Sequence, residues 1–202
     1  MVNEAVFDGG GVIPSDLLVP LRLLVGCRIV DVIRFSWWAP EEAQQECGLT
    51  SEEVFSLTAG PAVITFDSGV VMGVSSNPST NSVSVWMERD KSGSLVRSDS
   101  LMSDEELHPI SAKDQKFSCQ FWYQVVGARV DAVSILVRRP ATARLEELPN
   151  EVGLCFLLDS GEKFVAAHGL HNDSDDFVII PEELIWDVLH TELEEIRIGE
   201  WV

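Results

Sequence analysis

Two stretches of this chain, 101 residues apart, share one order of apolar and polar positions. Residues 24–32 and 125–133 each contain an apolar pair, a glycine, a small residue, an arginine and then β-branched residues. Each stretch follows apolar residues that are spaced as on one face of a helix. Gly26 and Gly127 stand where the C-terminus of a helix favours a positive φ. The pattern therefore predicts a helix followed by a long strand, once in each half of the chain.

A second pair of matching stretches predicts a β-hairpin in each half. At 62–74 and 154–167 an apolar run ends in Asp-Ser-Gly, and a second apolar run follows. In such a turn the aspartate accepts hydrogen bonds from the backbone, and the glycine takes the positive φ. A polar loop and a third apolar run come next, at 82–87 and 177–180. The same order of elements in both halves indicates a duplicated unit.

The fold class that these patterns predict is α+β, with two pseudo-repeated units, each a helix packed on a mostly antiparallel sheet. We expect the first unit at 1–100, with an insertion at 37–60 between its long strand and its hairpin. We expect the second unit at 101–202, and it adds a helix at 181–189 and a closing strand at 195–202.

The composition is that of a folded protein without a metal or disulfide framework. Of the 202 residues, 46% are hydrophobic, which is enough for a sizeable core. The four cysteines are scattered without a Cys-x-x-Cys pair, so we expect buried free thiols. There is no apolar run long enough for a membrane span and no basic, apolar leader at the start. These features predict a cytoplasmic protein.

The net charge of the chain limits the kinds of partner that it can bind. There are 33 acidic and 14 basic residues, a formal net charge of −19, and residues 101–202 hold 20 of the acids. Such a field repels nucleic acids and anionic lipids and attracts basic proteins. We therefore expect no nucleic acid or membrane partner. Solubility alone would also explain an acidic surface.

Candidate catalytic and metal-binding residues are few. His168 and His171 precede Asp173, Asp175 and Asp176, but their spacing fits neither a helical zinc pair nor an EF-hand. The Asp-Ser-Gly serines lack the Gly-x-Ser-x-Gly context of a nucleophile, so a turn role is expected. We predict no catalytic residue, metal or cofactor. An enzyme of unrecognised type, with His168 or His171 as base, stays open.

The insertion carries its own signals for helices and for binding. Pro40 before two glutamates predicts the start of a helix, and residues 50–53 predict a further turn. Trp37 and Trp38 would point to opposite faces of a persisting strand, so one of them would face away from the core. The residues that we predict to bind a partner come from two regions: Trp37, Trp38, Glu41, Glu42 and Glu46 in the insertion, with Glu52 and Glu53 beside them, and Asp173, Asp175, Asp176, Glu182 and Glu183 in the more acidic second unit.

The doubled strand and turn pattern resembles immunity proteins of bacterial toxin systems. The resemblance is carried by residues 25–32, 63–74, 126–133 and 154–167. It implies a non-enzymatic protein that neutralises a cognate basic toxin, nuclease-like in kind, through an acidic face. An adaptor or chaperone-like accessory protein of a secretion system is the alternative that we keep beside it.

Overall fold

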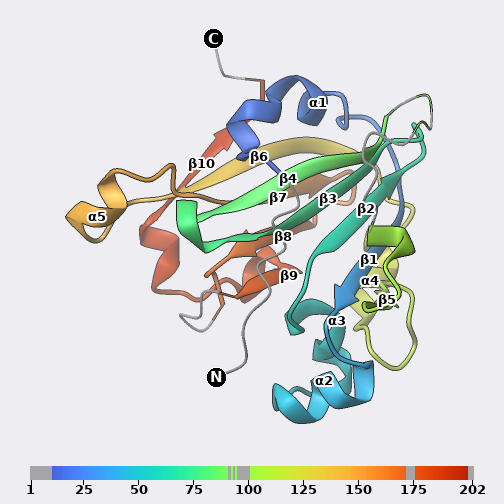
Figure 1. Cartoon of the computed structure of the whole chain (residues 1–202). Helices are drawn as coiled ribbons and strands as arrows, with labels where there is room; N and C mark the ends of the chain where they lie inside the picture. Colours follow the sequence, from blue (N-terminus) through green and yellow to red (C-terminus); the bar gives the residue numbers. More distant parts are fainter. Residues whose placement is uncertain (1–10, 91, 93, 95–100, 172–175, 200–202) are drawn as a thin grey trace.

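The computed structural model describes residues 11–90, 92, 94, 101–171 and 176–199. Within these residues ten strands form two five-stranded antiparallel sheets (Figure 1). The first sheet has the order β4-β3-β2-β1-β5, from β1 (Ile29–Ser36), β2 (Ala62–Phe66), β3 (Val71–Asn77), β4 (Ser82–Arg89) and β5 (His108–Ser111). The second has the order β10-β6-β7-β8-β9, from β6 (Val130–Arg138), β7 (Glu151–Leu158), β8 (Lys163–His168), β9 (Phe177–Pro181) and β10 (Leu193–Arg197).

The helices are short. The α-helices are α1 (Leu18–Arg22), α2 (Pro40–Glu46), α3 (Val54–Leu57), α4 (Gln120–Val125) and α5 (Ala143–Glu146). Single 3-10 turns are η1 (Pro14–Leu17), η2 (Ser51–Glu53), η3 (Pro78–Thr80), η4 (Leu101–Ser103), η5 (Glu182–Leu184) and η6 (Leu189–Thr191). The predicted helix start at Pro40 and the turn near 50–53 are confirmed by α2 and η2. None of the helices in the described parts of the chain has the length and apolar character needed to cross a bilayer.

Both sheets have the same strand order. In each, four strands follow one another as antiparallel neighbours, and a fifth strand returns to pair with the first. The first pairing also shifts register at matching places, between Ile29 and Asp31 in one sheet and between Val130 and Ala132 in the other. The α+β class and the strands of the two predicted hairpins are confirmed. Strand β5 lies after residue 100, where we placed the start of the second unit, and belongs to the first sheet.

The Asp-Ser-Gly turns hold the starts of the long strands, as the turn role predicts. The Asp67 carboxylate accepts the N–H of Arg28 at 2.9 Å, and Asp159 accepts the N–H of Arg129 at 3.1 Å. In both turns the glycine has a φ of +87°. Equivalent residues thus make equivalent contacts in the two units.

The two units meet through an exchange of backbone hydrogen bonds. The N–H of Gly26 donates to the carbonyl of Val130 at 2.7 Å, and the N–H of Gly127 donates to the carbonyl of Ile29 at the same distance. Between these bonds Arg28 faces Arg129 in an antiparallel bridge. Each bond in one direction has its counterpart in the other, so the contact follows an approximate two-fold axis.

The sheets pack face to face around one shared core. Strand β4 contacts β7 and β8, and β3 contacts β8. The largest cluster of buried side chains draws on both sheets and on α1 and α4; it includes Leu21, Ile64, Met72, Val85, Trp122, Leu154, Phe156, Phe164 and Ile179. The helix-on-sheet packing that we expected is not confirmed. Helices of five and six residues cannot cover a five-stranded sheet, and the opposite sheet does so instead.

The outer face of each sheet is covered by the segment that leads into its fifth strand. On the first sheet Leu101 and Leu107 pack with Trp86 and its neighbours. On the second sheet Ile185 and Leu189 take that role. Because both faces of each sheet are covered, most strands are buried on both sides.

Our prediction of a helix at 181–189 is wrong. The segment consists of η5, an extended residue at Ile185 with ψ of 132°, and η6. The N–H of Trp186 donates to the carbonyl of Leu170 at 3.2 Å, a tertiary contact that takes it out of any helical ladder. The closing strand is present but earlier than predicted, as β10.

The four cysteines are free thiols, as predicted, but they are not all buried. Cys155 is buried, Cys27 and Cys119 are half-buried, and Cys47 is exposed.

Candidate functional site

The insertion of the first unit packs against the second unit. Helix α3 lies against β9, and the N–H of Phe55 donates to the carbonyl of Phe117 at 2.9 Å. The indole N–H of Trp122 donates to the Ser56 hydroxyl at 2.9 Å, and the rings of Trp122 and Phe55 meet edge to face at 4.8 Å. These buried contacts fix the insertion firmly on the surface.

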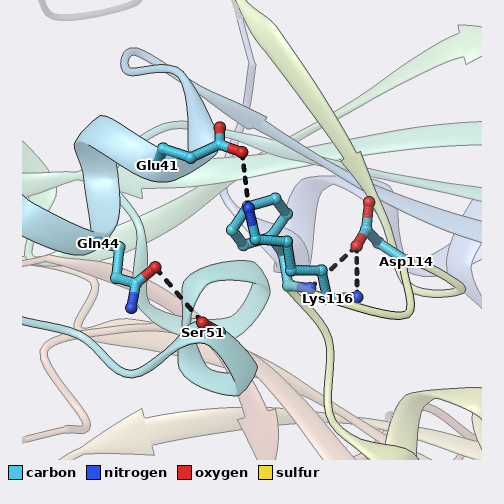
Figure 2. Close-up of polar contacts among 6 residues, drawn as sticks. Glu41, Gln44, Ser51, Asp114 and Lys116 are labelled. Carbon is cyan, nitrogen blue, oxygen red and sulfur yellow. Dashed lines mark hydrogen bonds and ion pairs between the residues drawn. The ribbon is translucent and has the colours of Figure 1, made fainter.

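Further polar contacts fix the outer helix of the insertion. Figure 2 shows Lys116 reaching from the turn before α4 to Glu41 of α2, at 2.8 Å. This hydrogen bond lowers the pKa of Glu41. In the same view the Ser51 hydroxyl points to Gln44 at 3.4 Å. Because Glu41 already forms an ion pair with Lys116, less of its negative charge is available to a partner.

A buried arginine lies beneath the insertion. Arg34, on β1, is fully buried, and its Nη2 donates to the carbonyls of Thr58 and Phe177, the latter at 2.6 Å. Its guanidinium lies over the Phe177 ring at 4.7 Å from the centroid. Burial lowers the pKa of Arg34 to about 9, while the charge of Asp176 acts in the opposite direction. Arg34 thus joins the first sheet, the insertion and β9 at one point.

Sequence reasoning missed Arg34, although a signal for it existed. Val32, Arg34 and Ser36 alternate along β1 and are all buried. A charged residue at a position that a strand pattern assigns to the core is a sign of a special environment.

The packing of α3 against β9, with Arg34 bonded to carbonyls of Thr58 and Phe177, brings the insertion to the start of β9. Burial raises the pKa of the Cys47 thiol, and the nearby carboxylates of Asp176 and Glu46 raise it further. Glu53 lies close enough to His171 for the two to interact, and His171 Nδ1 is 3.4 Å from the carbonyl of Leu184. We call this surface the junction face: Glu46, Cys47 and Glu53 from the insertion, and His171, Asp176 and Leu184 from the second unit, with the exposed Glu183 that precedes Leu184 in the chain.

The other predicted partner-binding residues have different surroundings. Trp37 and Trp38 follow the end of β1 and are each 37% exposed, so the strand does not separate them into one buried and one outward side chain. Glu42 is exposed on α2. Glu182 forms an ion pair with Lys163 at 3.0 Å. Asp173 and Asp175 lie outside the described residues.

In one group of three potential metal ligands, two of the residues form ion pairs with a lysine. Ligand atoms of Cys155, Glu182 and Glu195 lie within 4.8 Å of one another. The Lys163 ammonium contacts both carboxylates, at 3.0 and 3.1 Å. Burial raises the pKa of Cys155 to about 12, so its thiol keeps its proton at neutral pH. The group is therefore an ion-pair cluster, in which one lysine bridges two glutamates, on the outer side of the second sheet.

The histidine that we kept as a possible base is part of the sheet packing. His168 is buried at the end of β8, and its Nδ1 lies 2.6 Å from the hydroxyl of Ser76 on β3. The two residues are 92 positions apart, the same distance as the two Asp-Ser-Gly turns. They thus meet as equivalent positions of the two units, where the sheets face each other.

Comparisons of this chain with protein-family models, curated proteins and solved structures found no match. The function is therefore inferred from the chemistry of the junction face.

Proposed function

We propose that this chain is a non-enzymatic binding protein of the immunity-protein kind, which captures and neutralises a basic effector protein through the junction face. The observation that carries the proposal is the packing of α3 against β9, which brings the insertion with its exposed Glu46 to the segment that holds the exposed Asp176. These carboxylates come from the two regions that sequence patterns favoured, and they lie on one surface. A cationic face of a partner would meet both at once.

The charge of the whole chain supports the same partner. A net charge of −19 draws a basic protein in from a distance and speeds association. It also keeps nucleic acids away from the surface. Binding of this type weakens as salt screens the charges, over about 10 Å at 0.1 M ionic strength.

The rigidity of the insertion supports tight binding. The Phe55 and Trp122 contacts fix α3, and the Lys116 ion pair holds α2. A surface that is already ordered loses little conformational entropy when a partner docks. The face is therefore suited to inhibition, which needs slow release.

The repeat supports the location. We infer that the two units arose by duplication, since their strand order, their bulges and the hydrogen bonds between Arg28 and Asp67 and between Arg129 and Asp159 match. We call these two aspartate hydrogen bonds the Asp-Ser-Gly clamps. Features that only one copy has are then additions to the shared frame. The connection between β1 and β2 carries α2, η2 and α3, whereas the matching connection between β6 and β7 carries α5 alone, and the junction face is built on the longer one.

Calorimetry with basic effector proteins encoded beside the gene tests the proposal. We expect the triple variant Glu46→Gln, Asp176→Asn, Glu183→Gln to weaken binding at least tenfold, because each lost carboxylate costs about 0.5–1 kcal/mol at an exposed interface. The matched control is Asp16→Asn, Glu146→Gln, Glu162→Gln, which removes the same charge from η1, α5 and the β7–β8 turn. It should bind within threefold of the parent protein.

Raising the salt from about 50 to about 300 mM should weaken the parent complex as well. Binding that ignores salt, or equal losses in both triple variants, would argue against the junction face. Co-expression with the effector then distinguishes an inhibitor from an adaptor that only takes part in delivery of the effector. A neutralising protein restores growth of the cells, whereas an adaptor leaves the effector toxic.

A further inference from the structure

The cover of the second sheet exposes three large apolar side chains. Leu184, Trp186 and Val188 are 49%, 44% and 56% exposed, while Ile185 and Leu189 between and after them are buried. The segment thus alternates between anchors that face the sheet and apolar residues that face solvent. We call Leu184, Trp186 and Val188 the Trp186 patch.

The described part of the first sheet's cover offers a comparison. The equivalent segment of the first unit runs from β4 to β5, and in the part of it that the structure describes Leu101 and Leu107 are buried. The two covers do the same structural task with two apolar anchors each. The second cover is anchored by its buried residues, and the Trp186 patch presents apolar surface beyond those anchors.

The backbone holds the patch in place. The N–H of Ile185 donates to the carbonyl of Glu182 at 3.1 Å, and that of Trp186 to Leu170 at 3.2 Å. The N–H of Leu189 donates to the carbonyl of Trp186 at 2.8 Å. A tryptophan on such a fixed segment is the type of residue that most often anchors a protein interface.

The charges around the patch define what can cover it. Glu183, directly before Leu184, and Asp187, between Trp186 and Val188, are both exposed. Lys163 is engaged by Glu182 and Glu195, and residues 176–197 contain seven acids and a single arginine. A second copy of this chain or an anionic membrane would meet like charge here. A segment that carries both lysine or arginine and apolar side chains complements the surface.

We infer that the Trp186 patch is the docking site for a basic, amphipathic segment of the partner protein. The inference rests on the proposed function and extends it, because Leu184 belongs to both the patch and the junction face. The junction face supplies long-range attraction, and the patch supplies the apolar anchor. Its apolar contact distinguishes the true partner from other cations.

A synthetic peptide tests the patch on the intact protein. The probe is an amphipathic helix of about 14 residues built from leucine and lysine, and its control has serine in place of every leucine. Titration calorimetry should show that the parent protein binds the leucine peptide about tenfold more tightly than the serine peptide. The double variant Trp186→Ala, Val188→Ser should lose that preference, whereas Trp186→Phe should keep most of it.

A matched control removes apolar surface elsewhere. Val19 on α1 and Leu23 directly after it are 72% and 46% exposed, and Val19→Ser with Leu23→Ser should leave both affinities within threefold. Thermal melting of each variant confirms that it is folded. Equal binding of the two peptides by the parent protein overturns the inference, and so does an unchanged preference in the Trp186 variant. Either result leaves the proposed function to be judged by the effector titration, where the charge variants act independently of Trp186.

Discussion

At the scale of single residues, Asp67 and Asp159 show how one side chain fixes the start of a strand. Each carboxylate accepts the N–H of the arginine that begins the long strand of its unit. The two turns also share the same glycine conformation. If the units are equivalent, the two hydrogen bonds contribute equally to stability.

We expect Asp67→Ala and Asp159→Ala each to lower the free energy of unfolding by about 1 kcal/mol, the usual net value of one hydrogen bond. Urea unfolding measures both, with Asp16→Ala on η1 as the exposed control. A loss at one site three times that at the other would show that the clamps are not equivalent.

Residue patterns predicted the Asp-Ser-Gly clamps but not Arg34. The clamps depend on local turn chemistry, which a tripeptide displays fully. Arg34 depends on carbonyls of Thr58 and Phe177, which lie 24 and 143 positions away. Only the packed structure brings those partners to it.

At the scale of elements, η2 is held by a capping box. Thr50 donates to the Glu53 carboxylate from its N–H at 2.8 Å and from its hydroxyl at 2.7 Å. These hydrogen bonds lower the pKa of Glu53. The insertion therefore begins its inner turn with a contact that acid removes.

The sign of the pH effect follows from the lowered pKa. The contact is fully present above the unfolded value of about 4.3 and is lost as the pH falls through the lower folded value. We expect Glu53→Gln to cost on the order of 0.5 kcal/mol at pH 7, small because the pair is exposed. Unfolding between pH 3 and 7 should show the difference from the parent protein shrinking on the acid side. A difference that stays constant with pH would contradict this origin.

The sequence patterns missed strand β5 and predicted a helix at 181–189 that is absent, and both errors have a physical reason. Strand β5 contains Pro109, which reads as a loop, yet an edge strand tolerates a proline because its outer side needs no donor. Residues 181–189 have helical signals at Pro181 and Glu182. The N–H of Trp186 instead donates to the carbonyl of Leu170, so it is not part of a helical ladder. In both cases a tertiary contact decided the local structure.

At the scale of the whole molecule, the strong negative charge opposes compaction. Self-repulsion raises the energy of the folded state, and screening relieves it. We expect the melting temperature to rise by a few degrees as NaCl goes from about 10 to about 300 mM. The variant Glu146→Gln, Glu147→Gln, Glu162→Gln should show a smaller rise, because less charge remains to be screened. A melting temperature that falls steadily with salt would show that favourable ion pairs dominate instead.

The packing of the two sheets was also beyond the reach of sequence patterns. Strands buried on one face alternate clearly, but here β7, β8 and β9 are buried on both faces. Their runs of apolar residues indicate strands without indicating what covers them. The meeting of the insertion with β9 depends on that packing, so the junction face could be proposed only as two separate regions.

The bridge between Arg28 and Arg129 has the form in which two identical subunits meet. A pair of identical subunits shows every substitution twice, on both sides of its axis. In a single chain that holds both halves, selection can act on each half alone. The two halves differ in the helices at 37–60 of the first and the Trp186 patch of the second, while the strand order beneath them is the same. Covalent linkage thus gives a symmetric frame the freedom to become one-sided, which is what recognition of an unlike molecule requires.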